Sequence, residues 1–236
     1  MTLIWSRHRP CRRQVHARHV QLGQEPITDA EIHGALRRAV AAVTSDMPDL
    51  PDSPDLPEWI RAARQQWRWQ GQVRPPFAVT PSPGQTSVWD FPRPPRLMHD
   101  TREVVVRWGD VEVARTRRAV LVQETAHPPS VYLPWIDVAH HLLQVAAGGS
   151  FCEWKGLAKY WTLVHGARCL SSVAWSYPQP LAGAEALADC VAFYPAALNC
   201  TVDGAAVTPQ PGGFYGGWIT PELVGPFKGE PGSEGW

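Results

Sequence analysis

The sequence lacks several features that would assign it to a familiar class of protein. It has no apolar run long enough to cross a membrane, and its first residues lack the apolar core of a signal peptide. Its 22 basic and 22 acidic residues cancel, whereas a protein that binds nucleic acid through phosphate contacts is usually basic. We therefore predict a cytoplasmic protein that binds neither membranes nor nucleic acid.

Metal-binding and cofactor-binding patterns are missing as well. The five cysteines include no C-x-x-C pair, which argues against a structural zinc site. The chain also has no phosphate-binding loop and no dinucleotide-binding glycine pattern. The sequence therefore predicts no metal and no cofactor.

Lysine is scarce, whereas tryptophan is abundant. The lysines are only Lys155, Lys159 and Lys228, so nearly all basic residues are arginine. The chain has 12 tryptophans, a residue that either fills a core or lines a binding surface. With an apolar share of 44%, the chain can build a core, and its many indoles predict at least one aromatic-lined pocket.

The first 80 residues predict an extension rather than part of a sheet. Residues 1–24 combine arginine and histidine with no acidic residue, which is typical of a disordered basic arm. Residues 25–80 predict a helical extension and a Pro-rich linker, and Thr28 and Glu31 form a capping box at the first helix.

A second helix is predicted from Pro57, because proline is favoured at the first helical position. It places Trp59, Ala63 and Trp67 on one face and ends before Gly71. This face either docks on the main domain or binds a partner protein through Trp59 and Trp67.

From residue 81 to residue 236 the pattern is that of a β domain. Short β-prone segments at close spacing predict antiparallel sheets around one core. The clearest is a hairpin, Glu103–Trp108 and Val111–Arg115, joined by Gly109-Asp110. The other expected strands are 118–124, 151–154, 157–164, 167–175, 191–194 and 199–207, with short helical segments at 135–143 and 183–189.

Glu124 and His127 are predicted at the end of a strand, just before Pro128 and Pro129, whose rigid rings hold the path of the chain. One interpretation is an acid–base or ligand-contacting pair. The other is that His127 caps a turn and that Glu124 pairs with an arginine.

The segment Cys152 to Lys155 is predicted to be part of a strand. Alternation would place Glu153 and Lys155 on one face and Cys152 and Trp154 on the other. Lys155 is then either a tuned amine beside Glu153 or half of a salt bridge, and Cys152 is either a nucleophile or an inert buried thiol.

Five aromatic residues form the group from which the aromatic candidates for the site come: Tyr160, Trp161, Trp175, Tyr177 and Tyr194. They either form a box for a planar or cationic ligand or fill the space between two sheets. Trp175 and Tyr177 lie where a strand ends, which favours the mouth of a pocket for these two residues.

The C-terminal segment Pro209–Trp236 alternates Gly and Pro with aromatic residues, which predicts an ordered wrap that buries Phe214, Tyr215, Trp218 and Phe227. Together with earlier blocks, this segment resembles the bacterial domain of unknown function 427 family over Pro81–Trp236. The blocks are SVWDFPRPPRL (Ser87–Leu97), ETAHPPSVYLP (Glu124–Pro134), FCEWKGLAKYW (Phe151–Trp161), AWSYPQP (Ala174–Pro180) and VAFYP (Val191–Pro195).

The resemblance implies a fold similar to a β-tent, in which two antiparallel sheets meet at an angle. In zinc-bearing relatives of that fold a metal pins the apex, and the missing C-x-x-C pairs imply that this pin is absent here. A name given to the family links it to nucleotidyltransferases. The stretch after Gly148-Gly149-Ser150 has no acidic pair to hold magnesium against a triphosphate, so the residues do not support that activity.

The sequence therefore predicts an antiparallel, mainly β, β-tent-like domain of two sheets that binds an unknown small polar or aromatic ligand. The expected pocket residues are Glu124, His127, Glu153, Lys155, Tyr160, Trp175, Tyr177 and Tyr194. The first alternative is an enzyme with Glu124 or His127 as general base and Lys155 stabilising a developing anion. The second is a partner-binding module that uses the N-terminal helices.

Overall fold

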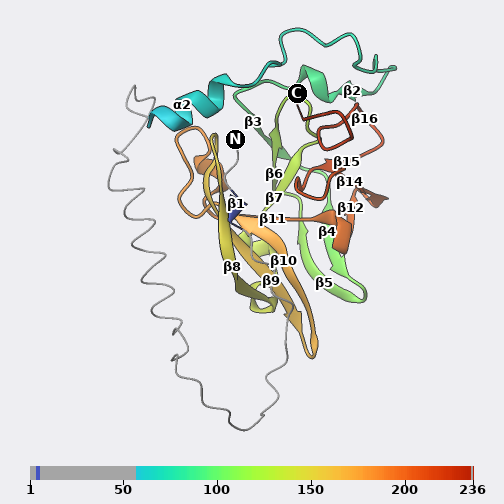
Figure 1. Ribbon diagram of the computed structural model, residues 1–236. Coiled ribbons are helices and arrows are strands. Elements are labelled where there is room, and N and C mark those ends of the chain that lie inside the picture. The colour runs from blue at the N-terminus through green and yellow to red at the C-terminus, as the bar shows by residue number, and fades with distance from the viewer. Residues whose placement is uncertain (1–3, 6–56, 235) are drawn as a thin grey trace.

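The computed structural model describes residues 4–5, 57–234 and 236 (Figure 1). The basic arm, apart from Ile4–Trp5, and the helix predicted at Thr28 and Glu31 lie outside the described residues. The prediction of a mainly β fold with antiparallel sheets and an N-terminal helix is confirmed. The elements are β1 (Ile4–Trp5), α2 (Glu58–Gln65), β2 (Thr86–Ser87), β3 (Arg96–Asp100), β4 (Val104–Trp108), β5 (Val111–Thr116), β6 (Ala119–Gln123), β7 (Ser130–Pro134), β8 (Leu143–Cys152), β9 (Gly156–His165), β10 (Arg168–Ser176), β11 (Cys190–Phe193), β12 (Asn199–Val202), β13 (Ala205–Ala206), β14 (Thr208–Pro209), β15 (Trp218–Ile219) and β16 (Leu223–Val224).

Two antiparallel sheets form the body of the domain. One has eight strands in the order β1-β8-β9-β10-β11-β7-β6-β3, and the other has four in the order β13-β12-β4-β5. The predicted hairpin is present as β4 and β5. Two small sheets involve the C-terminal segment: β14-β15 pairs its first residues with its middle, and the parallel pair β16-β2 attaches it to the rest of the domain.

The two faces of the eight-stranded sheet pack against different surroundings, because successive side chains of a strand point to opposite sides. On β7, Val131 and Leu133 pack with residues of the four-stranded sheet in one apolar cluster. Tyr132, between them, belongs to a second cluster with Trp175 and Tyr177. We call these the inner face and the cavity face of the sheet.

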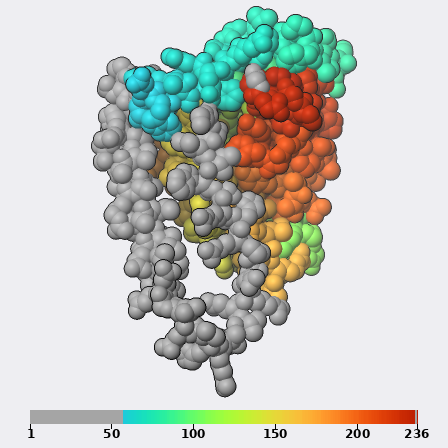
Figure 2. All heavy atoms as spheres, viewed as in Figure 1, coloured from blue at the N-terminus to red at the C-terminus, as the bar shows by residue number. Residues whose placement is uncertain are grey.

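A third cluster joins the N-terminal extension to the C-terminal segment. Trp89 is fully buried and donates from Nε1 to the carbonyl oxygen of Pro226 at 3.0 Å. Trp236 stacks on Phe77, with ring centroids 5.1 Å apart. Figure 2 shows the teal extension lying directly against the red C-terminal segment. These contacts make the C-terminal segment an ordered wrap, as predicted.

The four aromatic residues expected along this wrap are buried to different degrees. Trp218 is fully buried and donates from Nε1 to the carbonyl oxygen of Phe193 at 3.0 Å. Phe214, Tyr215 and Phe227 are only half-buried. The prediction of burial is therefore met in full by Trp218 and in part by the other three.

The structure corrects the predicted second helix. The helix α2 ends at Gln65, so Trp67 lies beyond it and does not share a helical face with Trp59. Ile60 and Ala63 are buried, which shows that α2 docks on the domain through these residues. Within the described residues, no helix has the length and apolar character that crossing a membrane requires.

Several strand boundaries differ from the sequence expectations. The helix expected at 135–143 is two 3-10 turns, Trp135–Asp137 and His140–Leu142, after which β8 begins. The strands β3 and β7 were not expected. β3 lies at the edge of its sheet and is largely exposed, so it has no apolar alternation, and β7 is enclosed by prolines that mask its pattern.

Candidate functional site

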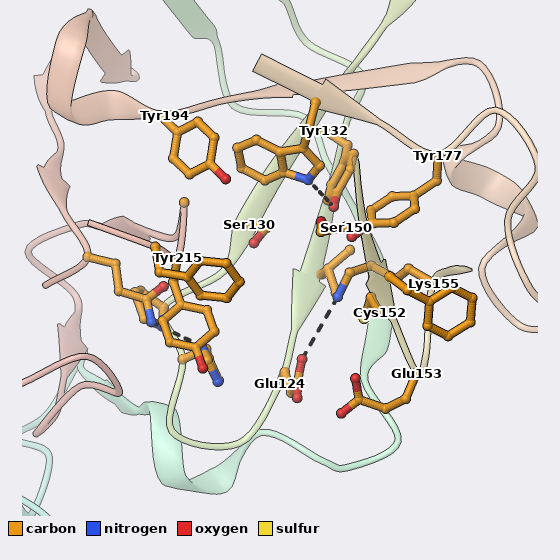
Figure 3. A pocket seen from close by; sticks show the side chains of 18 of the residues that line it. Glu124, Ser130, Tyr132, Ser150, Cys152, Glu153, Lys155, Tyr177, Tyr194 and Tyr215 are labelled. Carbon is orange, nitrogen blue, oxygen red and sulfur yellow. Dashed lines mark hydrogen bonds and ion pairs between the residues drawn. The ribbon is translucent and has the colours of Figure 1, made fainter. Parts of the chain in front are cut away.

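A cavity of about 110 Å³ lies on the cavity face of the eight-stranded sheet, beneath the C-terminal segment (Figure 3). The structure brings all of the sequence-predicted site residues to it. They are Glu124, His127, Glu153, Lys155, Tyr160, Trp175, Tyr177 and Tyr194. Residues separated by up to 70 positions in the chain therefore share one environment, although their roles stay a prediction.

All five tyrosines of the chain line this cavity: Tyr132, Tyr160, Tyr177, Tyr194 and Tyr215. Burying a hydroxyl costs free energy unless it finds a hydrogen-bond partner. Core packing alone is served as well by phenylalanine. Each phenol hydroxyl at this cavity therefore needs a partner, either in the protein or in the cavity itself.

Some of these hydroxyls already bind neighbouring side chains. Trp175 donates from Nε1 to Tyr132 Oη at 2.9 Å, and Ser150 Oγ lies 2.8 Å from Tyr160 Oη. Burial raises the pKa of both Tyr132 and Tyr177, so their hydroxyls stay protonated at neutral pH. They are hydrogen-bond donors and acceptors rather than phenolate bases.

Lys155 and Glu124 form an ion pair in the cavity, with Nζ and Oε2 3.9 Å apart. Figure 3 shows the Lys155 side chain reaching into the cavity toward Glu124. Arg93 holds the other carboxylate oxygen, because its Nε donates to Glu124 Oε1 at 3.2 Å. Arg93 is itself almost fully buried, and its Nη1 and Nη2 donate to the carbonyl oxygens of Trp69 and Thr125.

The predicted strand through Cys152 to Lys155 is wrong. β8 ends at Cys152, and the three following residues form the turn into β9, where strand alternation does not apply. The carboxylate of Glu153 accepts from Trp67 Nε1 at 2.8 Å, and its carbonyl oxygen accepts from Arg64 Nε at 2.8 Å. Glu153 thus ties the N-terminal extension to the cavity rim, while Lys155 pairs with Glu124.

The protonation of Lys155 and Cys152 limits what they do chemically. Burial lowers the pKa of Lys155, but the groups around it, Glu124 among them, outweigh burial and hold that pKa above its usual range. Burial raises the pKa of Cys152, whereas the charge of Lys155 only partly opposes that effect. Lys155 is therefore a cation, not a tuned amine, and Cys152 is a thiol, not an activated nucleophile.

His127 is fixed by a hydrogen-bond network in the C-terminal segment. Gln210 Oε1 accepts from the backbone N–H of Gly217 at 3.1 Å, and its Nε2 donates to the Lys228 carbonyl oxygen at 2.8 Å. The amide nitrogen of Gln210 therefore faces His127 Nδ1, 3.0 Å away, which must accept. The proton of neutral His127 then lies on Nε2.

Burial, followed by the positive charges of Arg93, Lys155 and Lys228, lowers the pKa of His127 well below its usual value. The imidazole is therefore neutral at pH 7. With Nδ1 occupied and Nε2 protonated, His127 has no free nitrogen to act as a general base.

The C-terminal segment closes one side of the cavity. A Cβ atom at Gly216 would overlap the indole of Trp175, so the backbone lies flat on that ring. The ring of Tyr215 meets that of His127 edge-to-face, with centroids 4.6 Å apart. Replacing Gly216 by any larger residue would therefore disturb this wall of the cavity.

The sequence reasoning did not assign Trp67, Gln210 or Tyr215 to the site, although all three line the cavity. A signal was present for Tyr215, because it lies between two Gly-Gly pairs in an aromatic-rich segment. For Trp67 and Gln210 no local pattern existed, since each reaches the site through the tertiary packing of a segment far from the others.

The groups that line the cavity combine charged side chains with hydroxyl groups. Across residues 57–234 and 236 there is no group of three His, Cys, Asp or Glu side chains close enough to hold a metal ion. The charged groups are paired with one another, and the hydroxyl groups surround the remaining space.

Comparison with known proteins adds a family but no activity. A search of curated proteins gives no significant match. Residues 96–206, from the start of β3 to the end of β13, match the family described as "Domain of unknown function (DUF427)". The match is narrower than the resemblance in the sequence and leaves out Trp67, Gln210 and Tyr215. Residues 96–206 of this chain thus belong to the domain of unknown function 427 family.

Proposed function

We propose that this protein binds a small polar or aromatic ligand in the tyrosine-lined cavity. The observation that carries this proposal is that all five tyrosines of the chain line the same space as the Lys155 ammonium. The 3.9 Å between Lys155 Nζ and Glu124 Oε2 is too long for a hydrogen bond, and the Cys152 sulfur beside it is only a weak acceptor. A bound ligand would supply the acceptor that this ammonium needs.

Binding is favoured over acid–base catalysis by the state of the charged groups. His127 has its accepting nitrogen occupied by Gln210, and Lys155 stays protonated. Both oxygens of Glu124 already face cations, since Oε1 accepts from Arg93 and Oε2 lies 3.9 Å from Lys155 Nζ. His127 and Lys155 are therefore not prepared to accept a proton at neutral pH.

Two contacts support docking of the N-terminal extension over recognition of a partner protein. Trp67 donates to Glu153 and lies 4.1 Å under the Arg93 guanidinium, so it is already engaged within this chain. The Trp59 ring, though half exposed, meets Phe151 edge-to-face at 4.7 Å. The proposed role of this region is to complete the cavity rim.

A thermal-shift screen of the full chain against metabolites, nucleotides and metal ions tests the proposal. A ligand at 100 times its Kd adds about 2.7 kcal/mol, which raises the Tm by several degrees. The Ser130→Phe variant fills the cavity, and Ser171→Phe, on the exposed surface of β10, is its control.

We expect at least one compound to raise the Tm of the wild type and of Ser171→Phe but not of Ser130→Phe. A screen in which no compound shifts the Tm contradicts the proposal. So does a shift of equal size in Ser130→Phe, because binding would then take place elsewhere.

A further inference from the structure

The Lys155–Glu124 pair offers one donor and one acceptor to the same part of the cavity. Glu124 Oε1 is taken by Arg93, which leaves Oε2 facing Lys155 Nζ across 3.9 Å. Figure 3 shows both side chains ending in the same space, with Tyr132 and Ser150 nearby. A group placed beside this gap can accept from the ammonium and donate to the carboxylate at once.

A hydroxyl group fits this gap in both chemistry and geometry. It donates one hydrogen bond and accepts others, as the two partners require. A ligand oxygen about 2.8 Å from both Lys155 Nζ and Glu124 Oε2 would have an angle of about 90° between these two contacts. A hydroxyl oxygen tolerates this angle. A carboxylate only accepts and is repelled by Glu124, whereas an ammonium only donates and is repelled by Lys155.

The other cations close to His127, Arg93 and Lys228, do not line the cavity and already donate to groups of the protein. Arg93 donates to Glu124 and to two carbonyl oxygens. Lys228 Nζ donates to the carbonyl oxygen of Ser233 at 2.6 Å and faces further carbonyl oxygens at the C-terminus. A phosphate group would thus meet one half-neutralised lysine and two carboxylates, Glu124 and Glu153.

We propose that the ligand is electrically neutral and places a hydroxyl group between Lys155 and Glu124. This inference deepens the proposed binding function and rests on it. The hydroxyls of Tyr132, Tyr177 and Ser150, which also donate and accept, line the same cavity and suit a neutral ligand with further polar groups. Phenols and polyols share this chemistry.

Wild-type protein is titrated with six probes: phenol, catechol, myo-inositol, benzoate, benzylamine and AMP. Ligand-observed NMR measures the Kd of each probe. We expect a hydroxyl probe to bind about tenfold or more tightly than any charged probe, a ratio worth about 1.4 kcal/mol. Binding of phenol or catechol alone would identify an aromatic ligand, binding of myo-inositol alone a polyol, and both results support the inference.

Benzoate, benzylamine or AMP binding as tightly as the hydroxyl probes overturns the inference. If that binding is lost in Ser130→Phe, the proposed binding function stands and only the neutral-ligand inference fails. If none of the six probes binds and the wider screen also fails, both proposals are overturned.

A change of charge sharpens the test. Glu124→Gln keeps the shape of the side chain but leaves Lys155 without its counter-charge, so the preference should move from phenol toward benzoate by about tenfold or more. Glu112→Gln removes an exposed, arginine-paired carboxylate on the other sheet and should leave the preference unchanged. An unchanged preference in Glu124→Gln contradicts the inference, and if this variant does not fold the wild-type ratios decide alone.

Discussion

The inner face and the cavity face of the eight-stranded sheet are formed by the same strands but carry different kinds of side chain. On the inner face, aliphatic side chains and Phe193 pack against the four-stranded sheet. On the cavity face, tyrosine and tryptophan surround a space that also holds paired charges. The alternation of β7 places Leu133 on one face and Tyr132 on the other, so neighbouring residues serve different purposes.

This difference predicts that stability and the proposed binding depend on opposite faces of one sheet. Burial of a closely packed apolar face stabilises the fold, and truncating one of its side chains lowers the free energy of unfolding by a large amount. Hydroxyl groups and paired charges add little to stability, since each polar group loses its hydration when it is buried. We therefore expect substitutions to lower stability most on the inner face and to change binding most on the cavity face.

The largest loss of stability should come from Leu133→Ala on the inner face. Leu133 is fully buried in the cluster between the sheets, and a buried Leu→Ala change costs about 2–5 kcal/mol. Chemical denaturation measures this as a fall in the free energy of unfolding, with the preference among ligands unchanged. A loss below about 1 kcal/mol would show that the inner face is not the tightly packed side.

A smaller loss is expected for Tyr132→Phe on the cavity face. The variant keeps the ring but removes the oxygen that accepts from Trp175 Nε1, and a buried donor left unpaired costs about 1–3 kcal/mol. The same denaturation experiment applies, with probe binding measured alongside. The proposed difference between the two faces is contradicted if Tyr132→Phe lowers the free energy of unfolding more than Leu133→Ala does, or if it leaves probe binding unaffected.

His127 should make stability fall at mildly acidic pH. Its pKa is lowered by folding, so the unfolded chain, with a pKa of about 6.5, takes up a proton that the folded chain refuses. The stabilisation is present above pH 6.5 and is lost as the pH falls toward the lowered pKa, by at most about 1.4 kcal/mol per pH unit.

Denaturation at pH 5 and pH 7 measures this effect in the wild type and in His127→Asn, whose side-chain oxygen accepts from Gln210 in place of Nδ1. We expect the variant to lose this part of the pH dependence, whereas His99→Asn, an exposed control, keeps it. An equal pH dependence in all three proteins would mean that His127 is not buried in its neutral form.

The fold class was accessible from the sequence because it depends on local signals. The Gly109-Asp110 turn and the flanking valines predicted β4 and β5 almost to the residue. The turn at Glu153 could not be predicted from the sequence, because it depends on contacts of Lys155 and Trp67 with residues distant in the chain. Local alternation suggests a strand wherever such long-range contacts are unknown.

Sequence patterns predicted which residues lie at the candidate site better than they predicted the chemistry of those residues. Charged and aromatic residues at strand ends pointed to Glu124, His127 and Tyr177, which do line one cavity. The tautomer of His127 was not accessible, since it follows from Gln210, 83 positions away. The low pKa comes from burial and from the charges of Arg93, Lys155 and Lys228, which no short motif encodes.

The smallest effect on stability should come from Tyr177→Phe, and this variant tests the central claim most directly. Tyr177 is buried and lines the cavity, and the role proposed for its hydroxyl is contact with a ligand rather than with the protein. Its free energy of unfolding and its affinity for phenol and catechol are measured side by side with those of the wild type. We predict a stability within about 0.5 kcal/mol of the wild type and a clear loss of affinity, because only the bound ligand uses this hydroxyl. A clear loss of stability with unchanged affinity would show that the tyrosines merely fill the core and would contradict the account.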